Sequence, residues 1–370
     1  MEVILERDVI LNSLNHIQGI IEKKNTLPIL ANVLIEASGN KVKLTATDLD
    51  IIFVEEIDTE VIEEGATSTS AAILYDIVRK SPINSKIEIK LINENKLQLK
   101  SGNSKFNLKC LKSEDFPLSN EDFQVEGVTF KSDNLKKIID KTKISISNDE
   151  TRHYLSGIFF HKTQQGDKFY FNAISTDSHR LSKSSFKLEN DIVFEPIILP
   201  RKIIFIISSM LENISKNVEV YNNKAKIKFE INNCSIISKV IDGKFPDYTQ
   251  VIPKENVKNL EINPKDFIKS VDRVASVSSD KKEGVKMHLL KDNVKLTVNS
   301  PSSGDGTELV QASFNSDEMS ISFNSKYLMD VASLMEGDKM VFNLKDTGSP
   351  AIIKDSSDPN SIFVIMPMKI

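Results

Sequence analysis

Apolar residues recur at spacings of three and four in three well-separated stretches of the chain, which is the pattern of one face of a helix. The stretches read ERDVILNSLNHIQGIIEK, NLKKIIDKTKISI and PKDFIKSVDRVASV. Their apolar positions are Ile10, Leu14, Ile17 and Ile21, then Leu135, Ile138 and Ile139, then Phe267, Val271 and Val274. Each stretch predicts an amphipathic helix with one buried side.

Segments in which apolar and polar residues alternate follow each of these helices, as expected of half-buried strands. They read VKLTATDLDIIFVEE, FYFNAISTDSHRLSKSS and VKLTVNSPSSGDGTELVQAS. A second helix is predicted in each copy, at 71–80, 200–212 and 325–336, and further strands with Gly or Asn in their turns close the copy. This threefold order predicts three α+β domains of similar size, at 1–126, 127–253 and 254–370.

Composition narrows the class of protein. The net charge of -4 excludes a uniformly basic nucleic-acid binder but allows a local basic surface. Residues 131–143 carry five Lys against two Asp, and 264–282 carry five basic residues against three Asp, whereas 55–64 is acidic. Two cysteines, Cys110 and Cys234, are too few for a disulfide framework or a common structural zinc site. The longest strongly apolar run, 203–207, is far shorter than a membrane span of about 20 residues. We expect a soluble cytoplasmic protein with reduced cysteines and no cofactor or metal.

The segment ISTDSHRLS at 174–182 resembles an active site because it places Asp177, Ser178, His179 and Arg180 in succession. Thr47 and Asp48 repeat the Thr-Asp pair in the first copy, so we expect the aspartate to accept backbone N–H groups in a turn. In a continuous strand, Ser178 and His179 would point to opposite faces and could not act together. We therefore predict no catalytic residues. A hydrolase using Asp177 and His179, and a monomeric three-domain scaffold, remain as alternatives.

Seven motifs in their order along the chain resemble those of one family, the bacterial DNA polymerase III beta subunit or sliding clamp. They are NTLPILANVLIE (25–36), TDLDI (47–51), RHYLSGIFF (152–160), ISTDSHRLS (174–182), LPRK (199–202), GKFPDYTQVIP (243–253) and VIMPMKI (364–370). The resemblance implies a head-to-tail homodimeric ring, with helices inside and antiparallel sheets outside, that encircles double-stranded DNA without reading its sequence. It also implies a processivity factor without chemistry of its own. Its partners would be the replicative polymerase alpha subunit, the clamp loader, and other polymerases and repair proteins.

The resemblance also assigns roles to individual residues. A peptide with glutamine, leucine and aromatic anchors would dock between the second and third domains, on Leu155, Thr176, His179, Arg180, Leu181, Pro246, Val251, Val364, Met366, Pro367 and Met368. The residues facing DNA would be Lys24, Arg79, His153, Tyr154, Arg201 and Lys202. The dimer interface would contain Phe106, Leu108 and Val277. Independently of the resemblance, the alternation in KFNLKCL (105–111) is typical of an edge strand, although its apolar side could also pack inside its own domain.

Several positions depart from the family pattern. Ser178 stands where the family usually has Gly, Gln250 and Lys369 replace Arg, Pro350 replaces Ser, and Ser276 replaces an apolar residue. Most of these positions adjoin the peptide-binding residues, so we expect them to change peptide preference and not the presence of the site.

Overall fold

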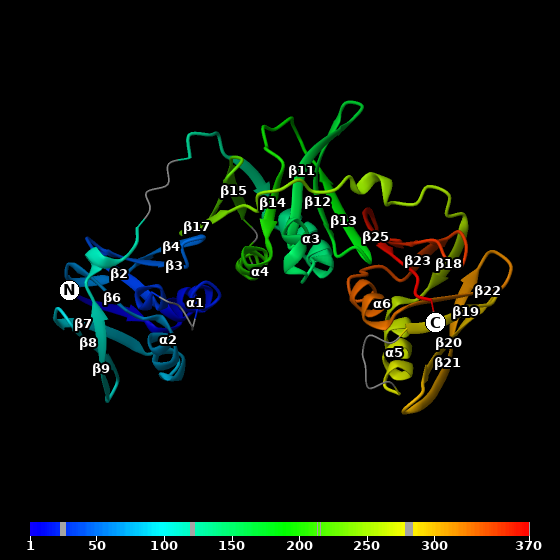
Figure 1. The fold of residues 1–370 in the computed structure, drawn as a ribbon. Helices are drawn as coiled ribbons and strands as arrows, with labels where there is room; N and C mark the ends of the chain where they lie inside the picture. Colours follow the sequence, from blue (N-terminus) through cyan, green and yellow to red (C-terminus); the bar gives the residue numbers. More distant parts are fainter. Residues whose placement is uncertain (23–26, 119–122, 213, 215, 278–283, 370) are drawn as a thin grey trace. The chain divides into compact units, whose positions relative to one another are not determined.

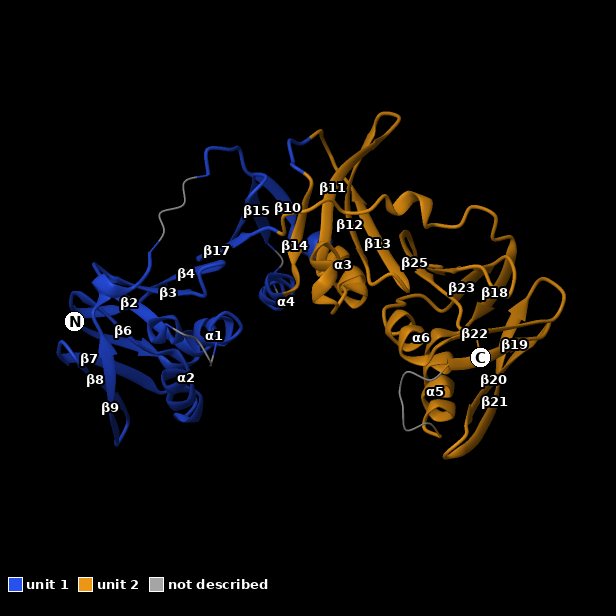
Figure 2. Cartoon of the chain, in the orientation of Figure 1, with its two compact units in different colours: residues 1–136, 192–195, 202–240 blue, residues 137–191, 196–201, 241–370 orange. Residues whose placement is uncertain are grey.

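The computed structural model describes residues 1–22, 27–118, 123–212, 214, 216–277 and 284–369 (Figure 1). The chain forms two compact units (Figure 2). Unit 1 contains residues 1–136, 192–195 and 202–240, and unit 2 contains residues 137–191, 196–201 and 241–370. The middle third of the chain thus contributes to both units. The predicted boundaries of the three domains stay a prediction.

Unit 1 is built on one antiparallel sheet of 13 strands. In spatial order they are β10 (Val128–Lys131), β15 (Asn217–Asn222), β16 (Lys226–Ile231), β17 (Cys234–Lys239), β4 (Ile51–Asp58), β3 (Lys41–Thr47), β2 (Asn32–Ser38), β6 (Gly65–Ser70), β9 (Ser104–Leu111), β8 (Lys96–Ser101), β7 (Lys86–Asn93), β1 (Glu2–Glu6) and β5 (Glu60–Glu63). Pairing of β17 with β4 makes the sheet continuous from the first copy into the middle copy.

The helices of unit 1 are α1 (Arg7–Gln18), α2 (Ala71–Lys80) and α4 (Arg201–Met210), the last from Lys202 onward. Two short 3-10 turns, η1 (Pro28–Ala31) and η2 (Ser113–Asp115), complete it. The stripe predicted for the first helix is buried, since Ile10, Leu14 and Ile17 have no exposed surface. Ser70 begins α2 because its hydroxyl accepts the Ile73 N–H, an N-cap that satisfies one of the first free donors.

Unit 2 contains a 12-stranded antiparallel sheet. Its order is β14 (Ile197–Pro200), β11 (Gly157–Gln165), β12 (Lys168–Thr176), β13 (Arg180–Lys187), β25 (Asp358–Ile365), β24 (Ala351–Asp355), β23 (Met340–Leu344), β18 (Lys258–Ile262), β21 (Gly304–Phe314), β20 (Asn293–Ser300), β19 (Gly284–Leu289) and β22 (Met319–Asn324). Here the pairing of β13 with β25 joins the middle copy to the last.

The helices of unit 2 are α3 (Ser132–Thr142, from Lys137 onward), α5 (Pro264–Ala275) and α6 (Ser325–Ala332). The 3-10 turns are η3 (Lys143–Ser145), η4 (Glu150–Leu155) and η5 (Tyr248–Gln250). Asn263 caps α5 by accepting the N–H groups of Lys265 and Asp266, and the predicted stripe Phe267, Val271, Val274 is buried. No helix in the described ranges is long and apolar enough to span a membrane.

Residues 174–182 are not one continuous strand, since β12 ends at Thr176 and β13 begins at Arg180, in agreement with the turn expected at Asp177. The chain reverses over Asp177, Ser178 and His179, and Ser178 adopts a left-handed backbone with φ of 76°. The predicted second helices are shorter than expected in two copies, ending at Met210 and Ala332.

Candidate functional site

The two Thr-Asp pairs form the same turn in different units. Asp177 Oδ1 accepts the N–H groups of His179 and Arg180, both at 3.0 Å, and the Thr176 hydroxyl donates to the Arg180 carbonyl at 2.7 Å. In the first copy, Asp48 Oδ1 accepts from Asp50 and Ile51, and Thr47 donates to Ile51. The expectation that this aspartate organises a turn is confirmed, which removes the carboxylate oxygen Oδ1 of Asp177 from any role as a general base.

Arg180 is 9% exposed and lies in a network of unit 2. Its guanidinium pairs with Asp177 Oδ2 at 3.1 Å and with Asp330 Oδ2 at 2.7 Å. It also donates to the Ile144 carbonyl and lies over the Tyr327 ring, 4.2 Å from its centroid. The side chain is thus occupied on every side by its own unit. It can position the turn and its neighbours, while little of it is available to an incoming peptide.

An apolar cluster of unit 2 brings together residues from distant parts of the sequence. Three of the predicted peptide-binding residues, Leu155, Leu181 and Val364, are buried in it. Leu181 and Val364 are cross-strand partners in β13 and β25, and the Met366 N–H donates to the His179 carbonyl at 2.9 Å. The other buried members are Ile174, Ile198, Phe245, Tyr248 and Ile352.

Exposed apolar residues follow directly on this cluster in the chain. Val251 is 48% exposed and precedes Ile252, which packs on the cluster, and Met366 is 41% exposed and lies two residues after Val364. Met368 is exposed to a similar extent, and its N–H donates to the Ser322 carbonyl at 2.7 Å. Pro246 and His179 are exposed, and Pro367 and Thr176 are half-buried. We call the exposed residues Val251, Met366 and Met368 the C-terminal patch.

Aromatic side chains form part of the same cluster and pack against it. The rings of Phe159 and Phe245 stack with centroids 5.0 Å apart, and Phe159 also stacks on His161 at 4.8 Å. His161 Nε2 lies 3.1 Å from the Tyr248 hydroxyl. Burial lowers the pKa of His161 below its ordinary value, and the positive charge of Lys183 adds to this shift. The neutral imidazole is therefore the favoured form in the folded chain.

The predicted DNA-facing residues differ in their exposure and in their hydrogen-bond and ion-pair partners. Arg79 is exposed near the end of α2, where it pairs with Asp76 at 3.1 Å. Arg201 is exposed and donates to Asn148. Lys202 is half-buried, because its ammonium donates to Asp48 Oδ2 and to the Ile20 carbonyl, both at 2.6 Å.

The other predicted DNA-facing residues are His153, Tyr154 and Lys24. The exposed His153 has Nε2 at 3.2 Å from the Asp242 carbonyl and packs edge-on against the half-buried Tyr154. Lys24 lies outside the described residues, as do 278–282 of the second basic segment.

β9 presents a free edge, as its alternating sequence predicts. It pairs with β8 from Ser104 to Lys109, and with β6 only at Cys110 and Leu111. From 104 to 109, the edge opposite β8 pairs with no strand among the described residues. Phe106 is exposed and Leu108 half-buried on this strand, so Phe106 is not taken up in the core of its own unit.

β21 repeats this arrangement in unit 2. It pairs with β20 from Gly304 to Gln311 and with β18 only from Ala312 to Phe314, which leaves its outer edge open over 304–311 within the described part of the chain. Leu309 on this strand is 63% exposed. The predicted interface residue Val277 lies beside it, because a Cβ placed on Gly306 would stand 2.9 Å from Val277 Cγ2.

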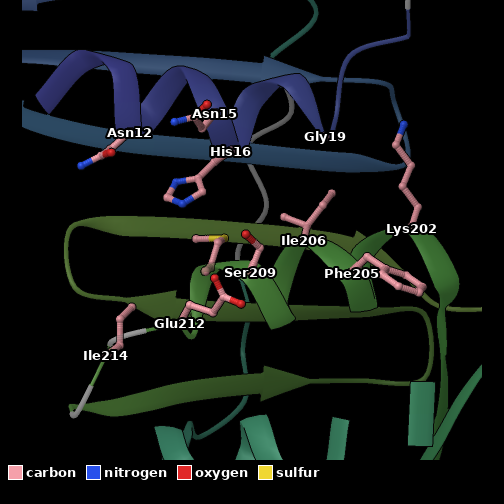
Figure 3. Close-up of a pocket in the computed structure, with 11 residues that line it drawn as sticks. Asn12, Asn15, His16, Gly19, Lys202, Phe205, Ile206, Ser209, Glu212 and Ile214 are labelled. Atoms are coloured by element: carbon pink, nitrogen blue, oxygen red, sulfur yellow. The ribbon is translucent and has the colours of Figure 1, made fainter. Parts of the chain in front are cut away.

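Unit 1 also has a groove of about 830 Å³ between α1 and α4 (Figure 3). Asn12, Asn15 and His16 of α1 face Ser209 and Glu212 across it. Sequence reasoning did not predict this groove, because the residues that form it lie nearly 200 positions apart in the chain.

Comparison with known proteins covers the whole chain. Three family models match it in order: the DNA polymerase III beta subunit N-terminal domain at 1–120, central domain at 129–247 and C-terminal domain at 249–369. The beta sliding clamp of Caulobacter vibrioides is 34% identical over 372 residues, and that of Escherichia coli K12 is 30% identical, each with complete coverage of both chains.

Solved structures agree with these sequence matches. The crystal structure of a DnaN sliding clamp from Bartonella birtlesii bound to griselimycin matches with a TM-score of 0.95 at 36% identity, covering both chains completely. That of the Caulobacter crescentus beta sliding clamp matches with a TM-score of 0.94 at 34% identity, covering 100% of this chain and 99% of the other. The chain therefore belongs to the family of the bacterial DNA polymerase III beta subunit, the beta sliding clamps.

Proposed function

We propose that two copies of this sliding clamp close head to tail into a ring around double-stranded DNA, and that the ring tethers the replicative polymerase and other replication and repair proteins. Each of the proposed domains, 1–126, 127–253 and 254–370, would supply one third of a subunit. Enclosure retains the DNA in this arrangement, so the net charge of -4 is no obstacle. The protein works with chromosomal DNA, and we therefore assign it to the cytoplasm.

The main observation that supports closure into a ring is that β9 and β21 each have a free strand edge. An open edge with unpaired N–H and C=O groups readily adds another strand. The two edges also differ in charge: Lys105 and Lys109 lie on β9, and Asp305 and Glu308 on β21. Pairing β9 of one copy with β21 of the other would join the sheets and set unlike charges beside each other. Phe106, Leu108 and Val277 would add apolar contact.

DNA contact is proposed to be weak and independent of sequence. Exposed Arg79, Arg201 and His153 can meet phosphates through water, which gives salt-sensitive binding without base readout. Lys202 contributes less than its charge suggests, because Asp48 already pairs with it. Tyr154 and Lys24 complete the proposed set.

Partner peptides are proposed to bind at the C-terminal patch above Leu155, Leu181 and Val364. Methionine side chains adapt to differently shaped apolar anchors, so one surface can serve several competing partners. Thr176, His179, Pro246 and Pro367 would border the peptide, and Arg180 would hold the turn that carries His179. The replicative polymerase alpha subunit, the clamp loader, and other polymerases and repair proteins are the proposed ligands.

We assign the protein no reaction. The hydrolase alternative needs Asp177 as a base, but its Oδ1 accepts two backbone N–H groups and its Oδ2 pairs with Arg180. A turnover that is reproducible in the purified protein and disappears in His179→Ala would contradict this assignment.

Topological binding has a direct test. The protein is loaded onto nicked circular DNA with a clamp loader, separated from free protein, and the DNA is then cut once. We expect retention on the circle in moderate salt and release on linearisation, because a ring can slide off an end. Equal retention on circular and linear DNA would show contact-based binding and overturn the ring. A stable species of about 42 kDa at micromolar concentration, measured by light scattering, would do the same, since 41.6 kDa is the mass of one chain.

A further inference from the structure

Three side chains that commonly bind transition metals meet inside unit 1. His16 comes from α1, Glu55 from β4 and Cys234 from β17. Glu55 and Cys234 are direct partners in the antiparallel pairing of β4 with β17. One ligand atom from each of the three side chains lies within 4.8 Å of the other two. The fold therefore collects one nitrogen, one carboxylate oxygen and one sulfur at a single point.

Two of these side chains keep buried polar atoms without a nitrogen or oxygen partner. Glu55 is 8% exposed; its Oε1 accepts from Asn233 Nδ2 at 3.3 Å, while its Oε2 has no nitrogen or oxygen donor among the described residues. The same holds for Nδ1 of His16. The carboxylate of Glu55 lies beside the Cys234 thiol, whose pKa is raised by burial and by the charge of Glu55. Buried polar atoms are nearly always paired, and an exception calls for an explanation such as a bound ion or water. A cation at this point would give both atoms a partner.

We propose that His16, Glu55 and Cys234 bind one Zn²⁺ ion. Imidazole, thiolate and carboxylate are the three ligand types of zinc sites in proteins, whereas Mg²⁺ and Ca²⁺ require sites made almost entirely of oxygen. Three protein ligands leave a fourth tetrahedral position, which water fills in zinc sites of this kind. The site differs from the partner-binding and DNA-facing residues described above and does not depend on them.

The geometry requires only small movements. Zinc bonds of about 2.0–2.3 Å place tetrahedral ligand atoms roughly 3.3–3.8 Å apart. The three ligand atoms lie within 4.8 Å of one another, so shifts of about 1 Å close the site. Side-chain rotations can supply this because the backbone pairing of Glu55 with Cys234 already fixes their spacing. Asn233 orients the carboxylate from outside, as groups around metal ligands usually do.

One of the three ligands borders a groove. His16 lines the groove between α1 and α4, and in Figure 3 its ring projects from α1 into this groove. Glu55 and Cys234 are not among the described residues that line it, so a hydrated cation would enter past the imidazole. A bound ion would connect α1 and β4 of the first copy with β17 of the middle copy. Zinc would thus stabilise the continuous sheet where these two copies meet.

The test measures zinc binding to the purified full chain, after chelation and dialysis, by competition with a chromophoric zinc chelator. Co²⁺ in place of Zn²⁺ gives a second readout, because a thiolate ligand produces an intense near-ultraviolet absorption band. The variants are His16→Ala, Glu55→Gln and Cys234→Ser. Cys110→Ser is the matched control, since Cys110 is the other buried cysteine and lies outside this cluster.

We expect about one Zn²⁺ per chain and a higher melting temperature with zinc than without it. Each of the three variants should bind zinc at least about tenfold more weakly, and Cys234→Ser should lose the cobalt–thiolate band, while Cys110→Ser keeps both. The wild-type measurement alone can overturn the proposal, whatever the variants do: no zinc binding in the competition assay, or no thiolate band with Co²⁺, would refute it. Equal weakening in Cys110→Ser would also refute it.

Discussion

At the scale of single residues, two turns show how a sequence repeat becomes a structural repeat. Thr-Asp at 47–48 and at 176–177 forms the same hydrogen bonds, and each turn contains a non-glycine residue in the left-handed region: Leu49 with φ of 77° and Ser178 with φ of 76°. This backbone is costly for L-residues other than Gly and, to a lesser degree, Asn and Asp. The Gly that the family resemblance places at the position of Ser178 would adopt this left-handed backbone without that cost.

Leu49 offers a test of this cost. We expect Leu49→Gly to be more stable than Leu49→Ala by about 1 kcal/mol, because glycine adopts the left-handed region freely and alanine does not. Exposed Ile73 in α2 is the control, where alanine should be more stable than glycine by about the same amount. Urea midpoints of the four variants measure both orders. If Leu49→Ala is instead more stable than Leu49→Gly, the left-handed backbone at residue 49 is not strained.

The C-terminal patch gives a second prediction at this scale. Val251→Ala combined with Met366→Ala removes exposed apolar contact without opening the core, so binding should fall while folding does not change. We expect a loss of about 1.4 kcal/mol or more, which is at least a tenfold weaker Kd, for a fluorescent peptide with glutamine, leucine and aromatic anchors.

Anisotropy measures this binding, and Val193→Ala combined with Val257→Ala is the control, because both valines are highly exposed and lie outside the predicted set. We avoid Leu181→Ala as a test because Leu181 is buried, and a cavity there would confuse binding with stability. Equal affinity of the patch variant and the control would exclude the patch as the binding surface.

At the scale of elements, periodicity predicted what depends on the local sequence. The stripes of α1 and α5 are buried as expected, and β9 has the open edge that its alternation indicates. The turn at Asp177 was expected from the repeated Thr-Asp pair, and the hydrogen bonds of Thr176 and Asp177 form it directly after β12 ends at Thr176. The burial of Arg180 was missed, since its partner Asp330 lies 150 residues further along.

The buried His161 on β11 leads to a prediction of how stability depends on pH. The folded pKa of His161 lies below the ordinary value near 6.5 that it has in the unfolded chain. As the pH falls below about 6.5, the unfolded chain therefore binds a proton at this histidine that the folded chain binds only at lower pH. The free energy of unfolding falls as a result. We expect the melting temperature to drop between pH 7.5 and 5, and His161→Gln to reduce this drop while lowering stability at pH 7.5.

The comparison variant for this experiment is His179→Gln, which removes a different histidine, at an exposed position in the turn. Each unit of difference between folded and unfolded pKa contributes about 1.4 kcal/mol at low pH. An unchanged slope in His161→Gln would assign the acid sensitivity to other groups.

At the scale of the whole molecule, the sequence could indicate the threefold plan but not which strands would join. The ladders between β17 and β4 and between β13 and β25 link the copies into long sheets, and the alternation within each strand does not indicate which strand it will pair with. The cluster of His16, Glu55 and Cys234 depends on the first of these ladders. Spacings of 39 and 179 residues match no local metal motif, so the sequence alone could not suggest the proposed zinc site.

The proposed closure of two copies makes an electrostatic prediction. Lys105→Glu combined with Lys109→Glu would place like charges where the β9 edge meets the acidic β21 edge. Like charges across paired strands are destabilising, so the dimer dissociation constant should rise about tenfold or more. Asp305→Lys added to this variant should recover part of the affinity; Glu308 is left unchanged because it pairs with Arg273. Lys86→Glu with Lys168→Glu, at exposed positions on other strands, controls for net charge.

Sedimentation at several concentrations measures the dimer, and the same variants enter the loading assay on circular DNA. If the ring retains DNA by enclosure, the lifetime on the circle should shorten in proportion to the weaker dimer and recover in part with Asp305→Lys. Charge-driven binding gives a different order: the doubly acidic variant and the control would lose DNA equally. The order of the lifetimes on circular DNA, for the doubly acidic variant, its Asp305→Lys derivative and the Lys86→Glu, Lys168→Glu control, therefore distinguishes a closed ring from binding by a basic surface.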